Sequence, residues 1–196
     1  HLDHLRPTHI VLTHRHPDHI GGLKNGRNTP VYATEETWQA LEKLNLRNNI
    51  VAPREPFEIA GLRFEAFPVE HSINAPAVGY RISSKRSVFF YSPDVVFIHE
   101  EEEALSGAAL YIGDGARLTR PLVRKVAGGR LAGHTPVQTQ LTWCAKHGVP
   151  RALITHCGSG IVKGDERRLR AQLNRLARQR GVEARIAYDG MQLELP

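Results

Sequence analysis

Four metal-binding side chains in one short segment are the strongest chemical signal in this sequence. Three imidazoles and one carboxylate stand within six residues, at His14, His16, Asp18 and His19. The segment follows an apolar run that ends at Leu12, so we expect it on a loop at the carboxyl end of a strand. Such a group is costly to desolvate without a cation among its members, and imidazole and carboxylate are ordinary zinc ligands. The segment therefore predicts a metal site.

Further candidate ligands follow other predicted strands. His71, Asp94 and His156 each come shortly after a strand, and His134 stands just before a predicted helix. Ligand sites in α/β folds gather at the carboxyl ends of strands, so we expect these side chains to meet the first segment. Taken singly, His71, Asp94 and His134 fit a structural role as well as a functional one. Asp114 is interpreted as a turn residue, with an acidic role in the site as the alternative.

Short apolar runs alternate with amphipathic stretches, which is typical of a layered α/β domain. One helix is expected after Thr34. A second opens at Thr135, where Gln138 would complete a capping box, and a third runs from about residue 165 to residue 180. Strands are expected over residues 9–12, 31–33, 62–67, 77–82, 88–91, 110–112, 152–155, 184–187 and 192–195.

The composition favours one globular domain over residues 1–196. Of the 196 residues, 41% are hydrophobic, and the formal net charge of +6 favours phosphate-bearing partners. No apolar run approaches the ~20 residues that cross a bilayer, so no membrane segment is expected. Two cysteines do not make a disulfide framework, which favours a reducing, cytoplasmic location.

The pattern of these residues resembles the metallo-β-lactamase superfamily of two-metal hydrolases. The first motif, His14-x-His16-x-Asp18-His19, is followed in the expected order by His71, Asp94 and His156. Gly133-His134-Thr135 before a helix and the late Asp189-Gly190-Met191 are similar to the phosphodiesterase branch. That branch includes tRNA 3′-processing endonucleases, cyclic-phosphate phosphodiesterases and pyrroloquinoline quinone biosynthesis protein B.

The resemblance implies a four-layer αββα sandwich and two divalent ions, with zinc as the first choice and manganese or iron as alternatives. His14, His16 and His71 would hold one ion, Asp18, His19 and His156 the second, and Asp94 would bridge them. His134 would contact phosphate or protonate the leaving group, and Asp18 and Asp94 could accept a proton. The implied reaction is phosphodiester hydrolysis by a metal-bound hydroxide, with a small molecule or RNA as the substrate. For the oligomeric state, a homodimer is an open alternative.

Two departures from the family pattern are visible. Superfamily members carry strands before the first motif, whereas only 13 residues precede His14, so the N-terminal strands are expected to be missing from this chain. The stretch between His19 and His71 also contains no long Gly/Pro-rich arm of the kind that tRNA-processing members use. The second departure disfavours tRNA as the substrate.

Two other functions stay open. The same scaffold could attack a carbonyl carbon in a lactone, thioester or β-lactam. A non-enzymatic nucleic-acid-binding module is the third alternative. It would use the arginine-rich helix that carries Arg167, Arg168, Arg170, Arg175, Arg178 and Arg180.

Overall fold

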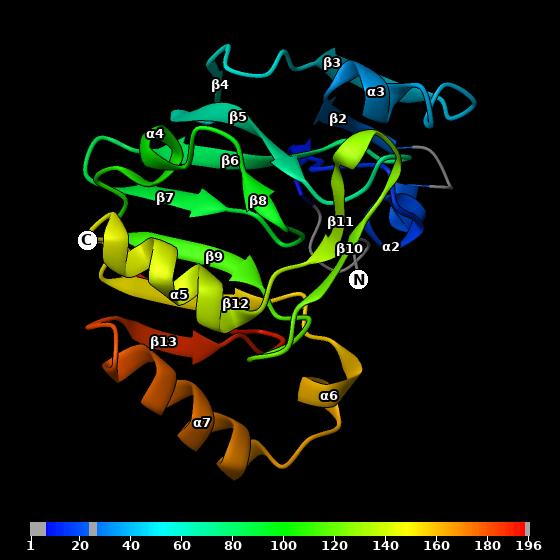
Figure 1. The fold of residues 1–196 in the computed structure, drawn as a ribbon. Helices are drawn as coiled ribbons and strands as arrows, with labels where there is room; N and C mark the ends of the chain where they lie inside the picture. The colour runs from blue at the N-terminus through cyan, green and yellow to red at the C-terminus, as the bar shows by residue number, and fades with distance from the viewer. Residues whose placement is uncertain (1–6, 24–26, 195–196) are drawn as a thin grey trace.

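Apolar side chains cover both faces of the largest β-sheet, which packs against a smaller one. A computed structural model describes residues 7–23 and 27–194. Along β5, Phe64 and Ala66 face one apolar cluster, while Phe67 and Val69 face another. Because successive side chains of a strand point to opposite faces, this sheet must be covered on both sides. A second sheet covers one side and helices cover the other (Figure 1).

The larger sheet contains eight strands in the described part of the chain. Their order is β13-β12-β9-β7-β6-β5-β4, with β8 paired to β5. Pairings from β5 to β12 make β5, β7, β9 and β12 run in one direction, so their carboxyl ends meet at one edge. The strands are β4 (Phe57–Ile59), β5 (Leu62–Glu70), β6 (Ala77–Ser83), β7 (Val88–Tyr91), β8 (Phe97–Ile98), β9 (Leu110–Asp114), β12 (Arg151–Thr155) and β13 (Glu183–Ile186).

The smaller sheet is parallel and consists of β1 (Ile10–Val11), β2 (Arg27–Ala33) and β3 (Leu46–Ile50). The Tyr80 hydroxyl in β6 is buried and donates a hydrogen bond to the Leu12 carbonyl at 2.9 Å, which ties the two sheets together. Trp38 and Leu41 pack against the smaller sheet, beside α2 (Pro17–Ile20), the 3-10 turn η1 (Gly21–Leu23) and α3 (Glu35–Trp38).

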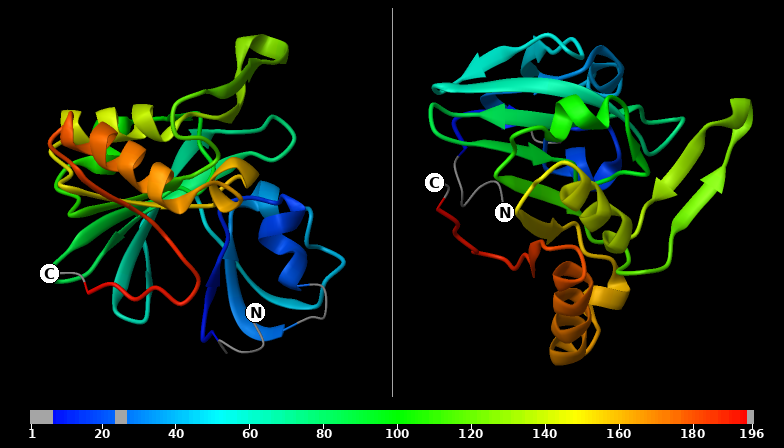
Figure 2. Two further views of the ribbon diagram at one scale, coloured as in Figure 1. Left: turned by 90° about the horizontal axis from the view of Figure 1, so that it is seen from below. Right: turned by 60° about the vertical axis from the view of Figure 1, so that its left-hand side comes forward.

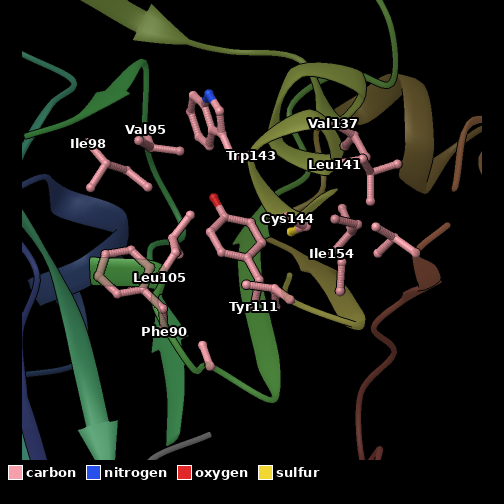
Figure 3. Packing of buried hydrophobic residues seen from close by; sticks show 14 of the residues in the cluster. Phe90, Val95, Ile98, Leu105, Tyr111, Val137, Leu141, Trp143, Cys144 and Ile154 are labelled. Atoms are coloured by element: carbon pink, nitrogen blue, oxygen red, sulfur yellow. The ribbon is translucent and has the colours of Figure 1, made fainter. Parts of the chain in front are cut away.

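Helices on the other side of the larger sheet enclose the main core. The buried cluster joins Phe90 and Tyr111 of the sheet to Leu141 and Cys144 of α5 (Figure 3). The elements on this side are α4 (Glu101–Leu105), α5 (Val137–Lys146), α6 (Ser159–Val162) and α7 (Glu166–Arg178). The order helix, sheet, sheet, helix is the four-layer αββα arrangement, and that prediction is confirmed.

A two-stranded ribbon stands apart from both sheets. It pairs β10 (Leu122–Lys125) with β11 (Leu131–His134) through the turn η2 (Ala127–Gly129). Figure 2 shows the ribbon projecting from the body of the protein. Among the described residues, no helix is long and apolar enough to cross a membrane.

Several local predictions were wrong. The Thr135–Gln138 capping box does not form, because Pro136 is the N-cap of α5 and no side chain caps it. The helix after Thr34 is only four residues long. No strand covers residues 192–194, and Leu195 lies outside the described residues. Strand β3 was missed because Asn48 and Asn49 have low strand propensity, which pairing with β2 overrides.

Candidate metal centre

The first motif lies where β1 ends, at the edge of the smaller sheet that meets the larger one. His14 is completely buried, and its Nδ1 atom lies 3.1 Å from the Thr13 hydroxyl, which orients the ring. The His14 Nε2 atom lies 2.9 Å from Nδ1 of His16, and Nε2 of His71 lies 3.2 Å from the same atom. Three ring nitrogens therefore converge on one point.

His71 reaches this point from the end of β5. Its Nδ1–H donates to the Gly133 carbonyl at 2.9 Å, which leaves Nε2 free for the cluster. A ligand histidine is normally oriented by such a bond from its second nitrogen.

A second group forms around α2 and the end of β12. Pro17 begins α2, which turns Asp18 and His19 toward His156. The Asp18 Oδ2 atom lies 3.2 Å from Nε2 of His156 and 3.6 Å from Nε2 of His19. His156 has a left-handed backbone with φ of 48°, an uncommon conformation for a residue with a side chain, and such strain clusters at functional sites.

Asp94 lies between the two groups. Its Oδ2 atom is 2.8 Å from Nε2 of His19 and 3.9 Å from Nε2 of His14. Its Oδ1 atom is 3.3 Å from Nδ1 of His156 and 3.8 Å from Nε2 of His71. The carboxylate is almost completely buried, and each of its oxygens contacts one imidazole of each group.

The electrostatics of the cluster suit cation binding. Burial, followed by the nearby His19 ring, lowers the pKa of His14 to about 3, and burial also lowers the pKa of His71. Burial opposes the charged forms of His19 and Asp94 as well. The contact between these two residues outweighs the effect of burial. It raises the pKa of His19 and holds the pKa of Asp94 well below its usual range.

The donor set fits divalent cations. Donor atoms of His14, His16 and His71 all lie within 4.8 Å of one another, and so do those of Asp18, His19 and His156. Two ligand atoms that each lie ~2.0–2.2 Å from one zinc ion are at most about 4.4 Å apart, so donor spacings of this order suit a shared ion. Two buried atoms of the cluster, Oδ2 of Asp94 and Nδ1 of His156, lie close to His19 Nε2 (2.8 Å) and to Oδ1 of Asp94 (3.3 Å), but neither contact has the geometry of a good hydrogen bond. Unsatisfied buried polar atoms at a point of convergence are expected where a cation binds.

His134 lies at the edge of this cluster and is held by Asp114. The Nδ1–H of His134 donates to Oδ2 of Asp114 at 2.7 Å, and this bond raises the pKa of His134. Asp114 is completely buried at the end of β9, and its Oδ2 atom also accepts from the Val95 N–H at 3.1 Å. These contacts fix the orientation of the His134 ring.

Gln140, on α5, fixes the backbone on either side of this pair. Its Oε1 atom accepts from the Asp114 N–H at 2.8 Å, and its Nε2 atom donates to the carbonyls of Asp114 and Thr135. The side chain is completely buried. A glutamine among the apolar positions Val137, Leu141 and Cys144 was the sequence signal that could have revealed it.

The structure brings together all eight residues that the sequence predicted for the site. Asp114 makes a turn contact and also contacts a predicted site residue, which are the two alternatives that the sequence left open. Its Oδ1 atom accepts from the Ala116 N–H at 2.8 Å, and its other oxygen holds His134. The assignment of individual residues to individual ions stays a prediction. The eight predicted residues are His14, His16, Asp18, His19, His71, Asp94, His134 and His156.

Known proteins share this sequence pattern and fold. Residues 2–157 match the family described as Beta-lactamase superfamily domain. A hydroxyacylglutathione hydrolase of Xylella fastidiosa (strain M12) is 27% identical over 151 residues, which are 75% of this chain and 49% of that relative. The chain thus spans about half the length of the curated relatives it matches.

Two solved structures have the same fold at low sequence identity. The metallo-β-lactamase fold protein YhfI from Bacillus subtilis superposes with a TM-score of 0.72 and 18% identity, covering 95% of this chain and 77% of YhfI. A diphosphatase from the PhnP family has a TM-score of 0.66 and 19% identity, covering 96% of this chain and 72% of the diphosphatase. With a family match over most of its length, the chain belongs to the metallo-β-lactamase superfamily.

Proposed function

We propose that this protein is a two-metal hydrolase that cleaves phosphodiesters. The observation that carries the proposal is the His134–Asp114 pair at the edge of the donor cluster. A protonated imidazole in this position can meet negative charge on a phosphate and can give a proton to the leaving group.

The residues of the chain would hold two divalent ions as follows. His14, His16 and His71 would hold one ion, Asp18, His19 and His156 the other, and Asp94 would lie between them. Zinc suits this mixture of imidazole and carboxylate, and manganese or iron binds similar sets. When bound, the ions supply Lewis acidity and lower the pKa of the water that attacks the substrate.

Three side chains would then handle protons and charge. Asp18 is exposed at the rim, and Asp94 is buried at the centre, so each can accept a proton from the attacking water at a different depth. Asp114 holds the Nδ1–H of His134, which leaves Nε2 of that ring to face the substrate. The raised pKa of His134 keeps more of this ring protonated near neutral pH.

The leaving group separates a phosphodiester from a thioester. Cleavage of an alkyl phosphodiester releases a strongly basic alkoxide, which needs a proton as it leaves. A thiolate is a much weaker base, since a thiol has a pKa of about 8.5, and it can leave without an acid. The His134–Asp114 pair therefore favours an oxygen leaving group.

Comparisons support two candidate reactions. The diphosphatase of the PhnP family acts on a phosphate compound, in keeping with our proposal. The curated relatives are named hydroxyacylglutathione hydrolases, so thioester hydrolysis is the second candidate.

A substrate panel tests the proposal. The zinc-loaded protein would be assayed with bis(p-nitrophenyl) phosphate, a dinucleotide and a hydroxyacylglutathione, with metal content determined by elemental analysis. We expect about two ions per chain and turnover of both phosphodiesters. Faster turnover of the thioester than of either phosphodiester would contradict the proposal and favour the second candidate.

A further inference from the structure

The β10–β11 ribbon is strongly cationic. Between residues 115 and 133 the sequence contains neither aspartate nor glutamate. Residues 119–125 and 127–130 are exposed, and Figure 2 shows this segment standing away from the body. The positive residues of this segment are Arg117, Arg120, Arg124, Lys125 and Arg130. A charged surface of one sign attracts ligands of the opposite sign.

The base of the ribbon belongs to the candidate metal centre. The Gly133 N–H donates to the His71 carbonyl at 2.8 Å, and the His71 ring donates back to the Gly133 carbonyl. In the strand register, Leu122 lies directly opposite His134. A two-stranded hairpin is marginally stable alone in water, so these bonds at its base position it beside the site.

One face of the ribbon turns toward the body of the protein. Leu122 and Arg124 lie on the same face of β10, and Ala132 is the partner of Arg124 across the ribbon. Ala132 is buried, and Nε of Arg130 lies 3.4 Å from Oε2 of Glu70, the residue before His71. This face is therefore the one that adjoins the metal centre.

Arg124 and Arg130 are both exposed cations on that face, but only Arg130 pairs with a carboxylate among the described residues, so Arg124 is available to a ligand. Arg124 lies two residues beyond Leu122, which places its backbone ~7 Å along the strand from the position opposite His134. Lys125 points to the opposite face, where its partner is Leu131. The same strand thus carries two neighbouring cations, of which only one faces the site.

We propose that Arg124 determines specificity by binding a second phosphate of the substrate, next to the phosphodiester that is cleaved. This inference rests on the proposed phosphodiesterase function and adds that the substrate carries at least two phosphates. A guanidinium forms paired, charge-assisted hydrogen bonds with phosphate. The second phosphate could be a terminal phosphate of a small nucleotide or the next phosphate of an oligonucleotide.

A second copy of the chain fits this face poorly. Two-fold association brings the same surface of both copies together. The cations Arg120, Arg124 and Arg130 of one copy would then lie against the same cationic surface of the other, and no carboxylate of the ribbon would offset the repulsion.

Dinucleotides with and without a terminal phosphate provide the test. The value of kcat/KM would be measured for uridylyl-uridine, for the same dinucleotide with a 5′- or 3′-phosphate, and for a hexauridylate. We expect one phosphorylated dinucleotide to be preferred over uridylyl-uridine by roughly tenfold or more. Arg124→Ala should remove this preference. The matched control, Lys125→Ala, loses the same charge from the opposite face and should retain the preference to within about twofold.

Salt dependence gives a second readout. For each phosphate contact on a single strand, the slope of log kcat/KM against log salt changes by about 0.7. Arg124→Ala should reduce the slope for the preferred dinucleotide by about this amount. A hexauridylate preferred well beyond the phosphorylated dinucleotide would identify an oligonucleotide as the source of the second phosphate, and equal rates would identify a small nucleotide.

Two results would overturn the inference while leaving the proposed function intact. One is cleavage of uridylyl-uridine with no gain from a terminal phosphate. The other is an equal loss of preference in Arg124→Ala and Lys125→Ala, which would show a diffuse effect of charge. A change in molecular mass in solution on Arg124→Ala, without a change in preference, would instead identify the ribbon as a contact between copies. Failure to cleave any phosphodiester would refute the proposed function itself.

Discussion

The Nδ1 atom of His134 lies 2.7 Å from the Oδ2 atom of Asp114, a carboxylate wholly buried at the end of a central strand. This contact gives His134 one orientation and a raised pKa. His134 is also 3.4 Å from Oδ1 of Asp94, so the pair stands beside the residues proposed to hold metal. Metal binding and proton donation can therefore be tested separately.

Replacement of His134 by alanine should leave both ions bound and slow cleavage of a dinucleotide by about 10² to 10⁴, the usual contribution of a general acid. The loss should be smaller with bis(p-nitrophenyl) phosphate, because a nitrophenolate leaves without a proton. Steady-state kinetics and elemental analysis would measure both. His147→Ala is the control. Nε2 of His147 lies 2.7 Å from Oε1 of Glu101, so it forms a similar pair, and this pair is away from the site. If His134→Ala loses metal, His134 is a ligand.

Asp114→Asn should shift the pH dependence of cleavage. The raised pKa of His134 depends first on its hydrogen bond with Asp114, so an uncharged partner should lower that pKa. A reaction that needs protonated His134 would then lose activity at a lower pH than in the wild type. The measurement is the alkaline limb of the kcat/KM profile. Asp165→Asn is a matched control, because asparagine also caps α7 well. Coincident profiles for Asp114→Asn and the wild type would argue against this positioning.

Asp94→Ala should lower the metal content of the protein, and we expect this to be its first effect. Asp94 contacts His19 at 2.8 Å and lies between the two donor groups, so its removal leaves five imidazoles without their shared counter-charge. Elemental analysis after gel filtration should show less than the wild-type metal content. Glu183→Ala, on the exposed edge of β13, should bind metal as the wild type does. Full occupancy in Asp94→Ala would exclude a bridging role.

Acidification should release the two ions at different pH values. Metal binding requires unprotonated imidazole. The pKa of His14 is lowered to about 3, so this ring is neutral at pH 6, and burial lowers the pKa of His71 as well. The raised pKa of His19 means instead that its proton competes with metal at this pH. The site of Asp18, His19 and His156 should therefore empty first as the pH falls. Zinc measured by equilibrium dialysis should decline from about two ions per chain at pH 8 to about one at pH 6. Loss of both ions in a single step would contradict this order.

Much of the fold could be predicted from the sequence where the signal is local. The expected strand at residues 88–91 matches β7, and the helix expected from about residue 165 matches α7, whose N-cap Asp165 accepts a hydrogen bond from the Arg168 N–H at 2.7 Å. Alternation and capping depend on residues close together in the chain, so they can be recognised without knowing the partners. Strand β10, with four exposed residues, has no buried face and gave no such signal.

For the site, the pattern of residue types predicted the candidate donors, with a proline and a pair of glycines around the first motif. It also placed each remaining donor after a strand, which was enough to predict that they meet. How they meet could be seen only in the folded protein. Asp94 is central because β7 lies in the middle of the sheet, and Asp114 holds His134 because β9 and the ribbon are brought together by contacts 20 residues apart. Gln140 acts on that pair from a helix packed across the sheet. Such contacts depend on strand order and packing between distant segments, which residue types and spacing do not encode locally.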